Sequence, residues 1–116
     1  MTALSIVIPA YNEEAGIAEI ARRVLTIKNA LVQVGIERLE LLVVDDGSRD
    51  NTAQRASEVE GVRLIRHPKN RGYGAALKTG FCQASGELIG FLDADGTCSR
   101  LHPPGLLSGL SWSTQT

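Results

Sequence analysis

The sequence has no excess of positive charge, few cysteines and no long hydrophobic run. Its 116 residues include 12 lysines and arginines against 13 acidic residues, so it offers no large basic surface for nucleic acid. Cys82 and Cys98 lack the spacing of metal ligands and are too few for the disulfide framework of a small secreted domain. The sequence contains no signal-peptide pattern and no stretch as long as a membrane span. These absences predict a cytosolic protein that binds no nucleic acid.

What the sequence does contain is a regular alternation of short apolar runs and amphipathic stretches. β-Branched apolar runs predict buried strands, and apolar residues at three- and four-residue steps predict helices. The expected strands are residues 4–9, 39–44, 62–65 and 88–92, and the expected helices are residues 13–34, 50–59 and 74–84. With 43% apolar residues the chain is long enough for one compact core. The alternation predicts an α/β fold in which helices cover both faces of a parallel sheet.

A cluster of polar or glycine residues follows each expected strand. Parallel strands end at the same edge of a sheet, and α/β proteins bind ligands at that edge. The four clusters should therefore form one site. They are residues 9–13, 45–48, 66–74 and 93–96.

Two carboxylates lie two positions apart in the last cluster, at Asp93 and Asp95. Side chains at this spacing on a strand point to the same side, so they repel each other unless a cation lies between them. Carboxylate oxygens suit a hard divalent ion, Mg²⁺ or Mn²⁺, which would also bind the oxygens of a substrate diphosphate. The motif is short and common, and a tight turn at Asp95 and Gly96 is an equally simple explanation.

The other clusters also have a functional and a structural interpretation. In residues 45–48, one aspartate can accept a hydrogen bond from a nucleobase or a ribose, or the segment is only a polar turn. Tyr11 can stack on a base or fill the core, while Asn12 is a candidate helix cap. The loop at residues 69–74 can approach phosphate or serve as a glycine-rich turn, since it matches no complete phosphate-binding signature. His67 and His102 have no metal-like partners, and we assign them no role.

Four motifs in this order resemble those of family 2 glycosyltransferases, most closely the dolichyl-phosphate and undecaprenyl-phosphate sugar synthases. The resemblance covers residues 4–97 and implies the GT-A fold. It also implies transfer of a sugar from a GDP- or UDP-sugar, with inversion at the anomeric carbon and a polyprenyl phosphate as acceptor. Such an acceptor would make the protein peripheral on the cytosolic membrane face. The motifs are Val7–Glu14, Val43–Ser48, Asn70–Ala75 and Leu92–Gly96.

The resemblance implies a role for individual residues of the donor site. It favours Asp46 over Asp45 as the contact to the base, and it identifies no protein nucleophile. Around the nucleoside it places Pro9, Tyr11 and Glu13; at the base, Val44 and Asp46; at the diphosphate, Asp93 and Ala94; and at the metal, Asp93 and Asp95.

The sequence departs from the family pattern after Thr97. In place of an aromatic residue and an acidic continuation, it has a tail rich in serine, glycine and leucine. We therefore expect two segments, a donor-binding part at residues 1–97 and an atypical tail at residues 98–116 that arises from a frame change or a fragment boundary. A sheet truncated after the fourth strand would expose an edge and favour self-association. An alternative function is a non-catalytic nucleotide-binding or interaction module, because the acceptor half is absent.

Overall fold

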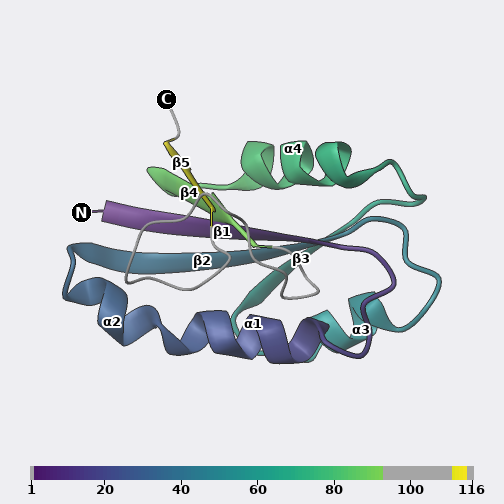
Figure 1. Cartoon of the computed structure of the whole chain (residues 1–116), viewed down its shortest axis with the longest axis horizontal. Helices are drawn as coiled ribbons and strands as arrows, with labels where there is room; N and C mark the ends of the chain where they lie inside the picture. The colour runs from purple at the N-terminus through teal and green to yellow at the C-terminus, as the bar shows by residue number, and fades with distance from the viewer. Residues whose placement is uncertain (1, 93–110, 115–116) are drawn as a thin grey trace.

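A computed structural model describes residues 2–92 and 111–114 of the chain. The sheet at its centre has five strands in the order β3-β2-β1-β4-β5 (Figure 1). Strands β1 to β4 are parallel to one another, and β5 is antiparallel to β4. The parallel α/β sheet predicted from the sequence is therefore confirmed. The strands are β1 (Thr2–Ala10), β2 (Ile36–Asp45), β3 (Val62–Arg66), β4 (Leu88–Phe91) and β5 (Ser111–Thr114).

Helices cover both faces of the sheet and make three layers (Figure 1). On one face lie α1 (Ile17–Thr26), α2 (Lys28–Val32) and α3 (Thr52–Ser57), and on the other lies α4 (Tyr73–Gln83). Alternating side chains of β1 and β2 supply both cores, because successive residues of a strand face opposite sides. Ile6 and Ile8 pack on the first face, whereas Val7 packs beneath α4.

The prediction of a single helix at residues 13–34 is wrong in two respects: the helix starts later, and it is interrupted. The helix begins at Ile17, since residues 12–14 are held by hydrogen bonds to the segment after β2. It is interrupted at Ile27, just after the Thr26 hydroxyl donates a hydrogen bond to the Arg23 carbonyl and so competes with the helical backbone bonds. The helical segment ends at Val32, before the predicted stop at Gly35, and Gly35 has a φ of 90° directly before β2.

Helix α4 lies unusually close to β1. A methyl group added at Gly80 would come within 2.3 Å of the Val7 Cγ1 atom, so the absence of a side chain permits the contact. The close packing fixes the first turn of α4 beside the carboxyl ends of β1 and β2. This end of the sheet, where the parallel strands β1–β4 end, is called the carboxyl edge below (Figure 1).

The fifth strand was not predicted from the sequence. Its backbone pairs with β4 in the register Leu88 to Thr114 and Phe91 to Ser111. Among the described residues, the edges of the sheet are therefore β3 and β5. The expected boundary after Thr97 and most of the expected tail lie outside the described residues, and self-association stays a prediction.

Candidate nucleotide site at the carboxyl edge

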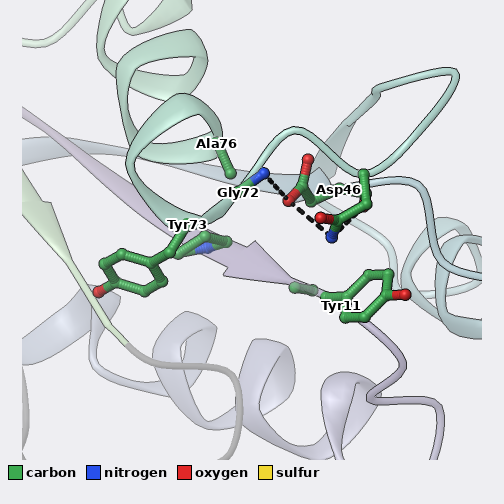
Figure 2. A pocket seen from close by; sticks show the side chains of 8 residues that line it. Tyr11, Asp46, Gly72, Tyr73 and Ala76 are labelled. Atoms are coloured by element: carbon green, nitrogen blue, oxygen red, sulfur yellow. Dashed lines mark hydrogen bonds between the residues drawn. The ribbon is translucent and has the colours of Figure 1, made fainter.

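A pocket of about 340 Å³ opens at the carboxyl edge (Figure 2). Three segments that are far apart in the sequence form its walls: the end of β1, the first residue after β2, and the loop that leads into α4. Three of the four clusters predicted to form one site therefore meet here, and the fourth, residues 93–96, lies outside the described residues. The lining residues are Pro9, Ala10, Tyr11, Asp46, Asn70, Gly72, Tyr73 and Ala76.

Two aromatic rings flank this pocket. Tyr11 follows β1 and Tyr73 begins α4, and their rings lie on opposite sides of the pocket (Figure 2). Both side chains are about half exposed, at 44% for Tyr11 and 51% for Tyr73. Exposed ring faces give a planar apolar ligand a surface on which to stack.

The loop that carries Tyr11 is anchored to the segment after β2. Asn12 has a φ of 53° and does not cap α1; instead its side-chain oxygen accepts a hydrogen bond from the Arg49 N–H at 3.0 Å. The N–H of Asn12 donates to the Ser48 hydroxyl at 2.9 Å, and the N–H of Glu13 donates to the Thr52 hydroxyl at 2.8 Å. These bonds hold the β1 side of the pocket in place.

The adjacent residues Asp45 and Asp46 lie on different faces of the sheet. Asp45 is the last residue of β2, is 1% exposed and accepts a hydrogen bond from the Ser48 N–H within its own turn. Its second carboxylate oxygen is buried without a hydrogen bond, at 3.8 Å from the Arg66 Nε atom. Asp46 instead faces the pocket and α4. The structure thus brings Asp46, the aspartate favoured by the family resemblance, to the pocket.

The carboxylate of Asp46 is surrounded by four hydrogen-bond donors. Its Oδ1 atom accepts from His67 Nδ1 at 2.7 Å and from the Arg71 N–H at 2.9 Å. Its Oδ2 atom accepts from Asn70 Nδ2 at 3.1 Å and from the Gly72 N–H at 2.9 Å (Figure 2). Asp46 therefore holds the loop at residues 70–72 that forms the far wall of the pocket.

The hydrogen bonds also determine the ionisation of Asp46. Burial raises the pKa of this carboxyl, but the bonds from His67 and from the N–H groups of Arg71 and Gly72 outweigh burial and hold the pKa below its ordinary value. Asp46 is consequently ionised at neutral pH and acts only as an acceptor.

Three residues of the 67–73 segment contribute to the site although no individual role was predicted for them; the segment itself belongs to a cluster that was expected at the site. His67, to which no role was assigned, is buried against Asp46, while Asn70 and Tyr73 line the pocket. The signal for His67 was its position directly after β3, where a side chain reaches the carboxyl edge. Nothing in the sequence indicated that it would contact a residue 21 positions earlier.

Of the other predicted nucleoside contacts, Pro9 lines the pocket, whereas Val44 is fully buried beneath α4. Glu13 is not among the lining residues, although its backbone N–H helps to anchor the adjacent loop. Asp93, Ala94 and Asp95 lie outside the described residues.

Within residues 2–92 and 111–114, no group of three or more His, Cys, Asp or Glu side chains is arranged to hold a metal ion. In the same part of the chain, no helix is long and apolar enough to cross a membrane.

The family model for glycosyl transferase family 2 matches residues 5–111. The chain belongs to glycosyl transferase family 2. This confirms the resemblance carried by the four motifs, and the fold is the GT-A fold of its structural neighbours.

Curated relatives of this family 2 chain include undecaprenyl-phosphate sugar transferases. An undecaprenyl-phosphate 4-deoxy-4-formamido-L-arabinose transferase from Pseudomonas aeruginosa is 43% identical over 97 residues, which are 79% of this chain and 27% of that protein. The Pseudomonas paraeruginosa protein of the same description is 42% identical over the same share of each chain. This chain therefore spans about a quarter of the length of these relatives, 27%.

Two solved structures are similar in fold and hold nucleotides with manganese. Glucosyl-3-phosphoglycerate synthase from Mycobacterium tuberculosis, in complex with Mn²⁺, UDP and glucosyl-3-phosphoglycerate, is 31% identical with a TM-score of 0.65, over 80% of this chain and 33% of that chain. A mannosyltransferase from Pyrobaculum calidifontis, in complex with GDP-Man and Mn²⁺, is 26% identical with a TM-score of 0.67, over 81% and 28% of the two chains.

Proposed function

We propose that the pocket at the carboxyl edge binds the nucleoside of a UDP- or GDP-sugar, the donor for glycosyl transfer. The observation that carries this proposal is the meeting of two aromatic rings and an ionised carboxylate in one pocket. Its volume of about 340 Å³ is at the lower end for small-molecule sites, which suits a base and ribose better than a whole nucleotide sugar. Both structural neighbours described above hold such a nucleotide.

Within this pocket, Tyr11 would stack on the base. Asp46, whose two oxygens already accept four hydrogen bonds from the protein, would lie beside the base and hold the loop wall that faces it. Pro9 would pack beside the nucleoside, and Val44 would support Asp46 from the core beneath it. Glu13 would lie beside the nucleoside, as the family resemblance implies. Tyr73 extends this set, because its ring lies across the pocket from Tyr11.

The diphosphate and the metal would lie beyond the end of β4. The Leu92 N–H donates a hydrogen bond to the carbonyl of Val7 in β1, and Asp93 directly follows Leu92 in the chain. Asp93 and Asp95 supply the carboxylate oxygens that Mg²⁺ and Mn²⁺ prefer, and Asp93 and Ala94 would contact the diphosphate. A divalent ion held there would offset the negative charge that develops on the departing nucleoside diphosphate.

The acceptor is proposed to be a polyprenyl phosphate, by similarity to the undecaprenyl-phosphate transferases. One oxygen of the acceptor phosphate would form a bond to the anomeric carbon as the bond to the diphosphate breaks on the opposite side. This displacement inverts the anomeric carbon without a protein nucleophile. A lipid-linked acceptor would bring the protein to the cytosolic face of a membrane as a peripheral protein.

Calorimetric titration with UDP and GDP tests the nucleoside part of the proposal. The wild-type chain should bind at least one of them, and Tyr11→Ala should weaken that binding about tenfold through loss of base stacking. Tyr11→Phe keeps the ring and should bind within about twofold of wild type. Equal binding by all three proteins would remove Tyr11 from the site, and no binding of either nucleotide by the wild type would contradict the proposed function.

The same titrations with and without Mn²⁺ or Mg²⁺ test the metal part. Affinity for the nucleoside diphosphate should rise when either ion is present, and Asp95→Ala should abolish this increase because it removes one carboxylate ligand. Glu37→Gln, at an exposed position of β2, is the control for loss of one negative charge. If affinity is the same with and without metal, or the increase persists in Asp95→Ala, the metal assignment is wrong.

A further inference from the structure

His67, the one histidine within residues 2–92 and 111–114, has no place in the donor chemistry above. His67 follows β3 directly, is 6% exposed, and its backbone N–H donates to the Asp45 carbonyl at 2.8 Å. Its ring lies between the turn after β2 and helix α4. Buried polar rings are retained where their nitrogen atoms are used, so the partners of this ring indicate its role.

Both ring nitrogens of His67 have a partner. Nδ1 lies 2.7 Å from Asp46 Oδ1, and Nε2 lies 2.8 Å from the Thr79 hydroxyl on α4. Ionised Asp46 can only accept, so the proton must be on Nδ1. In the neutral ring, Nε2 then accepts a hydrogen bond from the Thr79 hydroxyl. The ring thus joins Asp46 to α4 in a defined orientation.

The His67 ring contacts the Asp46 carboxylate, which in turn binds the loop at residues 70–72 that forms the pocket wall. The Asp46 oxygen that accepts from His67 also accepts from the Arg71 N–H, and the other oxygen accepts from the Gly72 N–H. The loop also packs tightly on the turn after β2, since a methyl group added at Gly47 would lie 2.3 Å from the Asn70 nitrogen. A carboxylate free to rotate would not hold both N–H groups at once.

We propose that His67 is a positioning residue for the nucleoside pocket, because its Nδ1–H fixes the Asp46 carboxylate in the rotamer that holds the loop at residues 70–72. This role rests on the proposed nucleotide site, and it adds a residue that does not itself touch the nucleotide. Without the Nδ1 donor, the population with a formed pocket wall falls, and nucleotide affinity falls with it.

Two substitutions separate the two ends of the ring. His67→Asn keeps an N–H donor near the position of Nδ1 and loses the contact with Thr79, whereas His67→Gln keeps a polar group near the position of Nε2 and loses the donor to Asp46. Thr79→Val removes only the hydroxyl partner and leaves the His67–Asp46 contact in place. If His67 only filled space, His67→Asn would not be expected to preserve the loop better than His67→Gln.

Amide hydrogen exchange at Arg71 and Gly72, followed by NMR, measures the hold on the loop without any nucleotide. We expect exchange about tenfold faster in His67→Gln, and within about twofold of wild type in His67→Asn and Thr79→Val. Wild-type exchange in His67→Gln, or equally fast exchange in both His67 variants, would overturn the proposal.

A nitrogen-15 spectrum of the wild-type ring at neutral pH gives a second test that requires no variant. We expect a proton on Nδ1, and a ring protonated only on Nε2 would overturn the proposal, because it could not donate to Asp46.

Titration of the same proteins with UDP and GDP tests whether loosening the loop at residues 70–72 weakens nucleotide binding. We expect binding about fivefold weaker in His67→Gln and near wild-type binding in His67→Asn. Unchanged affinity in His67→Gln would overturn the positioning role. If the wild type binds neither nucleotide while the exchange pattern appears, the proposed function is wrong and the hold of His67 on Asp46 stands.

Discussion

At the scale of single residues, Asp45 and Asp46 differ because successive side chains at a strand end point to opposite faces. Asp45 faces the side of α1 and α3 and bonds within its own turn, whereas Asp46 faces α4 and the pocket. The turn that follows them depends on Gly47, which has a φ of 74° and touches the loop before α4. Two adjacent aspartates therefore have different roles: Asp45 stabilises its own turn, and Asp46 forms part of the pocket.

Gly47→Ala should destabilise the protein by about 3 kcal/mol in the free energy of unfolding. An alanine there is strained by the positive φ, and its methyl group would lie 2.3 Å from the Asn70 nitrogen and the Lys69 carbonyl carbon. Urea denaturation of the two proteins measures the difference.

Gly35→Ala is the matched control, because Gly35 also has a positive φ, 90°, but no heavy atom lies within 4 Å of the added methyl group. It should cost only the backbone strain, about 1 kcal/mol. Equal losses at the two glycines would show that the contact between the turn and the loop contributes nothing.

The residues of the site were predictable where a motif marks them and not where a distant contact does. Tyr11 and Asp46 stand in motifs at strand ends and line the pocket. His67 stands in no motif and reaches Asp46 from 21 positions away. Asn70 stands in the motif Asn70–Ala75, but its contact with Asp46, 24 positions earlier, depends on how the segment after β3 folds back over the turn after β2.

At the scale of elements, a carboxylate far from the pocket joins three segments. Glu40 on β2 accepts hydrogen bonds from the Ser5 hydroxyl on β1 at 2.8 Å and from the Ser85 N–H before β4 at 3.0 Å. Burial raises the pKa of Glu40, but these bonds and the nearby Arg63 guanidinium outweigh burial and lower the pKa below its ordinary value. The folded state therefore favours the ionised form of Glu40.

This linkage predicts how stability depends on pH. A carboxyl group whose pKa is lowered by folding stabilises the protein above its unfolded pKa, about 4.3, and the contribution is lost as pH falls through the lower folded value. Glu40→Gln should thus be less stable than wild type at pH 7, and the gap should narrow as the pH falls below about 4. Urea midpoints across this range measure the gap.

Glu37→Gln, at an exposed position of the same strand, controls for the loss of one charge. A gap between wild type and Glu40→Gln that stays constant at every pH would show that the Glu40 carboxylate is not stabilised by folding.

The existence and order of the elements followed from hydrophobic periodicity, whereas their ends did not. The expected strand at residues 39–44 extends from Ile36 to Asp45, because pairing with β1 continues beyond the apolar run. The long expected helix became α1 and α2, since side-chain hydrogen bonds to the backbone at its start and at Thr26 compete with helical bonds. β5 had no periodic signal.

At the scale of the whole molecule, the parallel order of strands creates the candidate site. The alternation of strands and helices predicted that distant clusters would meet at one edge, and the pocket is formed there by the segments after β1, β2 and β3. The family model matches residues 5–111, a range that includes the segments forming the pocket. The chain spans 27% of the length of its curated relatives. The acceptor is therefore proposed from similarity to these relatives.

The central claim is that the pocket at the carboxyl edge binds a nucleotide. Titration of nitrogen-15-labelled protein with UDP and with GDP, followed by amide chemical shifts, tests this most directly. The account predicts that at least one nucleotide shifts the signals of Tyr11, Gly72 and Tyr73 and leaves those of Glu40 and Ser85 unchanged. Shifts concentrated around Glu40 and Ser85, or no shifts with either nucleotide at millimolar concentration, would contradict it.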